Sequence, residues 1–282
     1  MNGEGRIKKT PNPPGRCIFC GEGQLTKEHI YAAWMKPYLT ESKRTVHHVT
    51  TSVHPALQHL ADHRNEVGKM HLKGDHRSRA LRAVCRSCNN GWMSVLQSSA
   101  KSVLLPFIQG TYHSPTREEQ KAAAAWVTMF AMVFEQADLF TRAIDQKQRD
   151  FFMRHLKPPS NWLIWVAPFV GSKHSASTRH RGILFSGETP VETIPPGFMN
   201  MQCTVGVAGN MFFMSLSSTH ADVINFGLPA VRQLCMDRGF LRAWPTVGFQ
   251  QNASGAVDDF LFVNIIDEVT ETIYRSFNSI WR

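Results

Sequence analysis

The strongest constraint on this chain comes from two Cys-x-x-Cys pairs in its N-terminal third, Cys17/Cys20 and Cys85/Cys88. Each pair offers two thiolates at a spacing that suits one metal ion, and four thiolates complete the tetrahedral shell of a structural zinc. Residues 21–84 separate the pairs, which is a longer interval than zinc fingers usually have. We therefore predict one four-cysteine zinc site. A thioredoxin-like redox motif and two unrelated pairs are the alternatives.

The net charge of +9 is confined to the same third of the chain. Residues 1–101 contain 16 Lys and Arg against 7 Asp and Glu, whereas the remaining residues contain 15 of each kind. A basic segment on an otherwise neutral chain indicates a polyanionic partner such as nucleic acid. A solvated basic surface without a partner is the alternative.

Composition favours a packed protein over disorder, because 43% of the residues are hydrophobic and 19% are charged. Residues 1–16 are polar, basic and rich in Pro and Gly, so we interpret them as a flexible basic tail without a secretory signal. The longest apolar stretch, residues 122–134, is too short to span a bilayer. We expect a cytoplasmic protein with no membrane partner, in keeping with cysteine pairs that bind metal under reducing conditions.

Residues 17–110 are predicted to form one module. Short strands are expected at residues 25–30 and 80–84, and a helix at residues 89–101. Residues 40–78 are rich in His, Thr and Ser and lack clear periodicity. We interpret them as a long functional loop or insertion.

Residues 111–282 are predicted to form an α+β accessory domain. Thr116-Arg-Glu-Glu119 fits a capping box that begins a helix. Further helices are expected at residues 145–156 and 229–238, and strands at 162–169, 182–185, 203–207, 211–216 and 260–266.

The residues beside each cysteine pair point to chemistry. Lys27-Glu28-His29-Ile30 follows the first pair, and the second pair continues as Cys88-Asn-Asn-Gly-Trp-Met-Ser94. An acidic residue before His at a strand end, with Asn directly after the second pair, resembles the HNH (His-Me finger) endonuclease family. The longer string resembles a bacterial and phage subgroup. The resemblance covers about residues 17–102, and it implies an α+β fold: a zinc-braced ββα-metal nuclease module followed by the accessory domain.

The same resemblance implies roles for three residues. His29 is the expected general base, and Glu28 and Asn89 are the expected ligands of a catalytic Mg²⁺ or Mn²⁺. These residue types suit phosphodiester hydrolysis, because His titrates near neutrality and can take the proton of an attacking water. Carboxylate and amide oxygens are hard ligands for a divalent ion that neutralises charge on the phosphate. The alternatives are a surface Glu-His pair and an Asn89 that only caps a helix.

The sequence departs from the family pattern at one position. The middle Asn of the HNH pattern normally lies shortly before the second cysteine pair, but Ser78–Val84 contains no Asn. His76 or a backbone carbonyl is the expected substitute for orienting His29. Four arginines near this segment suit contacts with backbone phosphates, and an ordinary basic strand edge is the alternative. They are Arg77, Arg79, Arg82 and Arg86.

These inferences lead to two functional hypotheses. The first is an endonuclease that cleaves DNA, with RNA not excluded as a substrate. The second is a non-catalytic zinc-ribbon regulator that binds nucleic acid, for which Glu28, His29 and Asn89 have no evident use. A dithiol redox protein is a third and weaker hypothesis, and it predicts no binding to nucleic acid. For the accessory domain, ligand sensing, homodimerisation and docking of a protein partner remain open.

Overall fold

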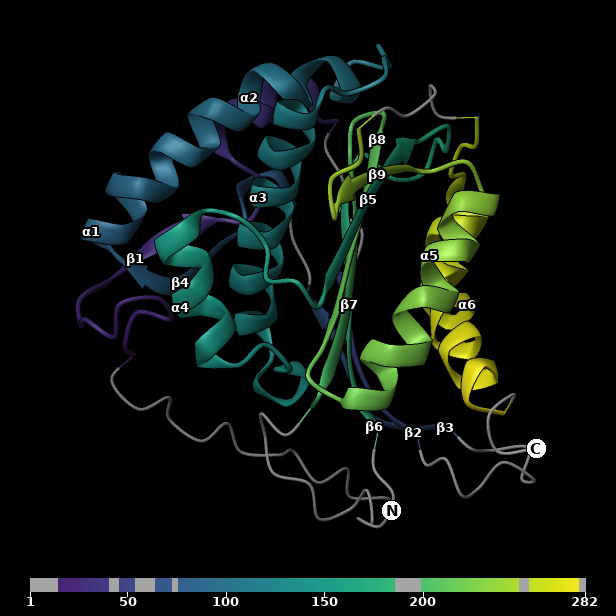
Figure 1. Cartoon of the computed structure of the whole chain (residues 1–282). Helices are drawn as coiled ribbons and strands as arrows, with labels where there is room; N and C mark the ends of the chain where they lie inside the picture. The colour runs from purple at the N-terminus through teal and green to yellow at the C-terminus, as the bar shows by residue number, and fades with distance from the viewer. Residues whose placement is uncertain are drawn as a thin grey trace, which may run out of the picture.

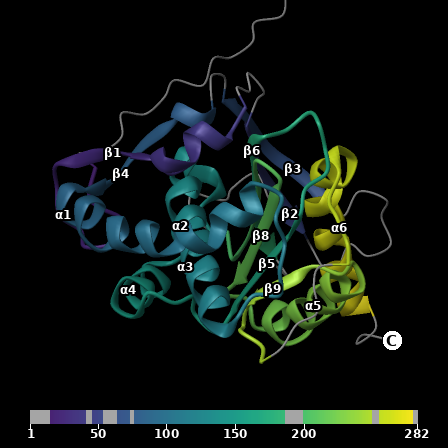
Figure 2. The same cartoon turned by 90° about the horizontal axis from the view of Figure 1, so that it is seen from above.

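The computed structural model describes residues 15–40, 46–53, 64–72, 76–185, 199–248 and 254–278. Its elements form three layers (Figure 1). A seven-stranded sheet stands in the middle, and helices cover both of its faces. Figure 2 shows the same layers from above. The protein is therefore a mixed α and β structure, as the sequence predicted.

A separate two-stranded ribbon carries the cysteine pairs. It consists of β1 (Leu25–His29) and β4 (Ala80–Cys85), which are antiparallel. The chain runs from β4 directly into α1 (Arg86–Cys88), η4 (Asn89–Met93) and α2 (Ser94–Ile108). The predicted strands and the helix after the second cysteine pair are thus confirmed.

The central sheet takes strands from distant parts of the chain. In spatial order they are β3 (Arg64–Leu72), β2 (Val46–Val53), β6 (Ala176–Phe185), β7 (Met201–Ala208), β8 (Met211–Ser218), β5 (Trp162–Pro168) and β9 (Leu241–Trp244). Neighbouring strands are antiparallel except β2 and β6, which are parallel. The four strands predicted at residues 162–169, 182–185, 203–207 and 211–216 are confirmed as parts of β5 to β8.

The prediction of a loop over residues 40–78 is wrong for the part that forms β2 and β3. Their Thr, His and Ser residues gave no clear alternation, so the strands could not be read from one segment alone. The neighbouring strands determine that this segment is a strand, because β2 pairs with β3 on one side and with β6 on the other. Part of the N-terminal third therefore shares a sheet with the C-terminal region.

The middle strands of the sheet are buried on both faces. In β5, Ile164 faces the core under α2 and α3, and Trp165 faces the opposite core. In β8, Phe213 faces the core under α2 and α3, and Phe212 faces the opposite core. A strand that is covered on both sides has no polar face, which explains why these segments are nearly continuous apolar runs.

Helices form the two outer layers of the structure. On the side of the ribbon lie α2, α3 (Arg117–Phe134) and α4 (Gln146–His155), and on the other side lie α5 (Leu228–Asp237) and α6 (Asp259–Asn278). The capping box is confirmed, because Thr116 Oγ1 accepts from the Glu119 amide and the Glu119 carboxylate accepts from the Thr116 amide. Shorter helical turns are η1 (Ala33–Tyr38), η3 (His76–Ser78), η5 (Glu135–Ala137), η6 (Leu139–Thr141) and η8 (Val223–Gly227). No helix in the described part of the chain is long and apolar enough to cross a membrane.

The prediction of a strand at residues 260–266 is wrong, because this segment is the first part of α6. Its buried side chains recur at three- and four-residue intervals: Phe262, Ile265, Ile266, Val269 and Ile273. A seven-residue window rich in Phe, Ile and Val shows high strand propensity but is too short to show this helical period.

The ribbon is attached to the central sheet through buried contacts. The Tyr31 hydroxyl lies 2.8 Å from both the Ser177 carbonyl oxygen and Thr178 Oγ1 on β6. The hydrophobic core on this side also contains residues from the ribbon, from α2 and α3, and from β5 and β8. These contacts hold the ribbon and its cysteines in a fixed position beside α2 and α3.

Candidate functional site

The four predicted zinc ligands lie together. The Sγ atoms of Cys17, Cys20, Cys85 and Cys88 are all within 4.8 Å of one another, and we refer to these residues as the cysteine cluster. Cys20 Sγ and Cys85 Sγ are 3.4 Å apart. The turn after Cys20 requires glycine, because Gly21 has a φ of 75°. This geometry is compatible with a structural metal ion such as zinc.

The surroundings of the cysteine cluster also fit a cation. Burial raises the pKa of Cys20 and Cys88, and neighbouring cysteines add to this effect. Burial also acts on Cys17, but backbone amides at its sulfur, including that of Cys20, lower its pKa below the usual value. The Trp92 side chain contacts Cys88 and favours its thiolate, and its buried indole N–H has no other hydrogen-bond partner among the described residues. Four thiolates this close together would need a bound cation to compensate their charge, and zinc is compatible with this role.

Aromatic residues hold the cysteine cluster against α4. Phe19, which lies between the first two cysteines, packs edge-on against Trp92 with ring centroids 4.9 Å apart. Phe152 on α4 contacts both rings. Gln146 Nε2 donates to the Ile18 carbonyl oxygen over 3.1 Å. The sequence did not predict this support, because α4 is more than 120 residues away from the first pair.

Glu28 is a buried carboxylate whose partners are amides. Its side chain is 5% exposed, and its Oε1 accepts a 2.7 Å hydrogen bond from Gln97 Nε2 on α2. Burial raises its pKa to about 7, although the side chains of Gln97 and Asn89 favour the charged form. Among the described residues, no Lys, Arg or His forms an ion pair with Glu28. Such a carboxylate is poorly compensated by the protein alone.

Asn89 is positioned by the cysteine that precedes it. It follows Cys88 at the start of the helix, and its Nδ2 donates to Thr26 Oγ1 over 3.0 Å and to the Lys27 carbonyl oxygen over 3.3 Å. Within the part of the chain that the structure covers, no group donates a hydrogen bond to Asn89 Oδ1. The Asn89 side chain also lies close enough to Glu28 to favour the charged carboxylate.

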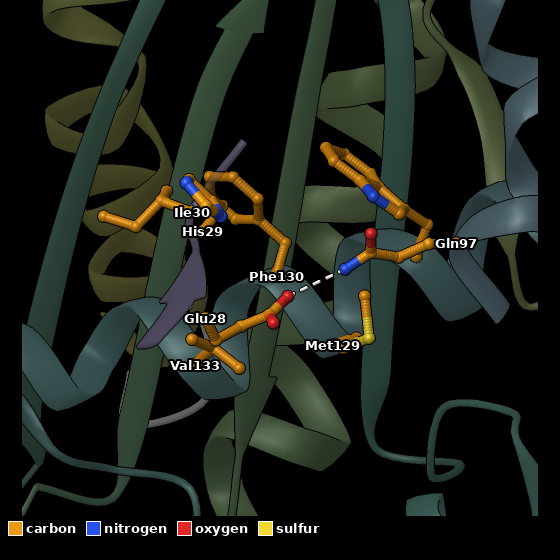
Figure 3. Close-up of a pocket in the computed structure, with 8 residues that line it drawn as sticks. Glu28, His29, Ile30, Gln97, Met129, Phe130 and Val133 are labelled. Atoms are coloured by element: carbon orange, nitrogen blue, oxygen red, sulfur yellow. Dashed lines mark hydrogen bonds between the residues drawn. The ribbon is translucent and has the colours of Figure 1, made fainter. Parts of the chain in front are cut away.

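His29 and Glu28 line the same small pocket, which has room for about one water molecule. Figure 3 shows the Glu28 carboxylate directed toward Gln97, with His29 on another side of the pocket. His29 is exposed, whereas Glu28 is buried. The remaining wall is apolar and comes from Ile30 and from four residues of α3: Trp126, Met129, Phe130 and Val133. Gln97 was not predicted, because nothing in the sequence indicates that it faces Glu28.

The four predicted phosphate-binding arginines differ in their exposure. Arg82 on β4 and Arg86 on α1 are exposed. Arg77 is half-buried and donates to the Leu39 carbonyl oxygen over 3.3 Å, and Arg79 is half-buried with a pKa that burial lowers. Arg82 and Arg86 are therefore the more accessible members of this set.

Several predictions fall on positions that the structure does not cover. Residues 1–14 of the expected basic tail at residues 1–16 lie outside the described residues, and so do residues 41–45, 54–63 and 73–75 of the expected loop. The substitute for the middle Asn of the HNH pattern, for which His76 was one candidate, stays a prediction.

Comparisons of the chain with family models, curated proteins and solved structures found no match.

Proposed function

We propose that this protein is a metal-dependent endonuclease of the HNH type that hydrolyses phosphodiester bonds in DNA. The observation that carries the proposal is the buried Glu28 carboxylate, which shares a pocket with His29, is influenced by the Asn89 side chain, and forms no ion pair with a basic side chain among the described residues. Its position favours a bound cation over a purely structural role, because amide donors alone leave its pKa at about 7. An exposed His beside such a carboxylate adds a group that can exchange protons with water.

The local arrangement of elements supports the same proposal. Two antiparallel strands, β1 and β4, are followed directly by a helix, and the cysteine cluster joins the loop before β1 to the start of that helix. This order agrees with the ββα-metal module that the sequence resemblance implies. Zinc in the cysteine cluster would hold Asn89 against Thr26 and so fix the distance between the helix start and Glu28.

Different residues at the pocket would have different roles in the reaction. Glu28 and Asn89 would hold Mg²⁺ or Mn²⁺ through one carboxylate and one amide oxygen, with Gln97 fixing the orientation of the carboxylate. A divalent ion bound there supplies charge neutralisation at the phosphate and the leaving oxygen. His29 accepts the proton of the attacking water from the exposed side of the pocket. The apolar wall of α3 limits water on the other side and lowers the local dielectric.

The experiment that tests this proposal compares wild type with His29→Ala. The zinc-loaded full chain is incubated with plasmid DNA, single-stranded DNA and RNA, with Mg²⁺ or Mn²⁺ added. Loss of the general base should slow cleavage about 100- to 10,000-fold and leave DNA binding intact. His155→Ala is the matched control, because His155 is also exposed but lies on α4.

Two results would contradict the proposal. Cleavage by His29→Ala at the wild-type rate would exclude His29 as the base. A wild type that binds nucleic acid but cleaves none of the substrates with either metal would favour the non-catalytic zinc-ribbon regulator.

A further inference from the structure

The exposed face of the β1–β4 ribbon carries two like charges in register. Lys27 on β1 is the cross-strand partner of Arg82 on β4, and both side chains are exposed. His29 is exposed two residues beyond Lys27, so it lies on the same side of the strand, whereas Glu28 between them is buried. Figure 1 shows the ribbon at the edge of the molecule, away from the central sheet.

This pairing works against the stability of the ribbon. Like charges directly opposite each other in an antiparallel pair are unfavourable. Among the described residues, no acidic side chain forms an ion pair with Lys27 or Arg82. Among the described residues, the Arg82 side chain donates to a neutral acceptor, the Leu25 carbonyl oxygen, over 3.1 Å.

The described segments that form and flank the ribbon contain few acidic residues. Glu22 and Glu28 are the acidic residues within residues 15–40 and 76–101, and Glu28 is buried on the other side of the ribbon. A local arrangement that weakens the fold without a structural gain indicates a functional use. The exposed face of the ribbon fits a polyanion that runs past His29.

We propose that Lys27 and Arg82 form a phosphate clamp, which binds the phosphodiester backbone of nucleic acid and leads it to His29. The clamp rests on the proposed function in one respect, because His29 is taken as the base that the bound backbone must reach. Lys27 was not among the phosphate-binding residues that the sequence predicted, because its position opposite Arg82 depends on the register of the ribbon. The register includes an irregularity between Thr26 and Lys27 that places Lys27 opposite Arg82, and Ala83 has no register partner on β1.

The test measures binding to short fluorescein-labelled DNA and RNA duplexes by anisotropy, over a range of salt concentrations and without added Mg²⁺ or Mn²⁺. The variants are Lys27→Gln, Arg82→Gln and the double variant of the full chain. Each lost phosphate contact should reduce the slope of log K against log salt by about 0.9. The same relation gives a loss of affinity of about eightfold per contact at 0.1 M salt. The DNA and RNA arms show which backbone is preferred.

A matched control distinguishes the effect of losing a local phosphate contact from the effect of lowering the net charge of the protein. Lys173→Gln with Arg275→Gln removes the same charge from exposed positions around α6. This double variant should keep the wild-type slope. Lys27→Gln should also unfold at the same or a higher urea concentration than wild type, because it removes the repulsion with Arg82. A residue kept only for stability would give the opposite shift.

The outcomes distinguish this inference from the proposed function. Wild-type salt slopes in Lys27→Gln and Arg82→Gln would overturn the clamp, even if the wild type cleaves DNA. Reduced slopes in a protein that does not cleave would support the clamp and contradict the nuclease. If the control variant loses as much affinity as the ribbon variants, the binding is non-specific attraction and the clamp is wrong.

Discussion

Glu28→Gln should make the protein more stable in the absence of Mg²⁺ and Mn²⁺, although it removes a proposed ligand. The Glu28 side chain is 5% exposed, and its described partners are the amides of Gln97 and Asn89. Glutamine has nearly the same shape, carries no charge and can still accept the hydrogen bond from Gln97. The substitution therefore removes the desolvation of a charge and keeps the packing.

The sign and size of the effect follow from the pKa of Glu28. Burial raises this pKa from 4.5 to about 7, so between these values the folded state holds a proton that the unfolded state has lost. Wild-type stability therefore falls as the pH rises through this window. At 1.36 kcal/mol per pKa unit, the loss reaches about 3 kcal/mol above pH 7. Glu28→Gln lacks this loss, so its advantage should be about 2–3 kcal/mol near pH 8 and small near pH 4.

Urea unfolding at both pH values, in buffer without added Mg²⁺ or Mn²⁺, measures this difference. Glu22→Gln is the control, because Glu22 is exposed in the loop after the first cysteine pair and should give no gain. Added Mn²⁺ should then narrow the gap, since only wild type binds it in the folded state. If Glu28→Gln is less stable than wild type near pH 8, the carboxylate is a structural element and the reasoning fails.

Two further predictions concern the cysteine cluster and the core of the sheet. The wild type should contain about one zinc per chain. Cys17→Ser should lose the zinc and unfold more readily, whereas the control variant Cys235→Ala should keep it. Elemental analysis that finds no zinc in a folded wild type would contradict the site. His180 is buried between Thr204 and the Thr141 carbonyl oxygen, and burial lowers its pKa from 6.5 to about 4. The unfolded state therefore takes up a proton first as the pH falls, and stability that is present above pH 6.5 should be lost by up to about 3 kcal/mol between pH 6.5 and pH 4. Unfolding curves of His180→Gln should lack this part of the acid loss, and an NMR titration of the wild-type imidazole near pH 6.5 would refute the prediction.

The sequence predicted local features well where one segment contained the whole signal. The capping box at Thr116 needs only four residues, and the two cysteine pairs define a cluster by their ligand type and number. The strands of the ribbon next to the cysteine pairs were predicted in the same way. The capping box and these strands have their physical cause within a few residues, whereas the cysteine cluster, whose pairs are separated by residues 21–84, was predicted from ligand type and number.

Features that depend on tertiary neighbours were missed or misassigned. β2 is a strand because β3 and β6 flank it, and its own residues show no alternation. The start of α6 was taken for a strand, because its apolar spacing becomes clear only over several turns of helix. Gln97 contacts Glu28 and Phe152 supports the cysteine cluster, and both lie on helices that are distant in the sequence. Lys27 lies opposite Arg82 only because of the register of the ribbon.

The most direct test of the proposed site is the Mn²⁺ dependence of DNA cleavage under single-turnover conditions. Supercoiled plasmid is mixed with an excess of wild type, Glu28→Gln or Glu22→Gln, and the cleavage rate is followed as Mn²⁺ is increased. The wild type and Glu22→Gln should cleave with a saturable Mn²⁺ dependence. Because even partners outside the ligand shell are worth about 10- to 100-fold, Glu28→Gln should lose about 100-fold or more. Cleavage by Glu28→Gln with the wild-type rate and Mn²⁺ dependence would contradict the proposed site.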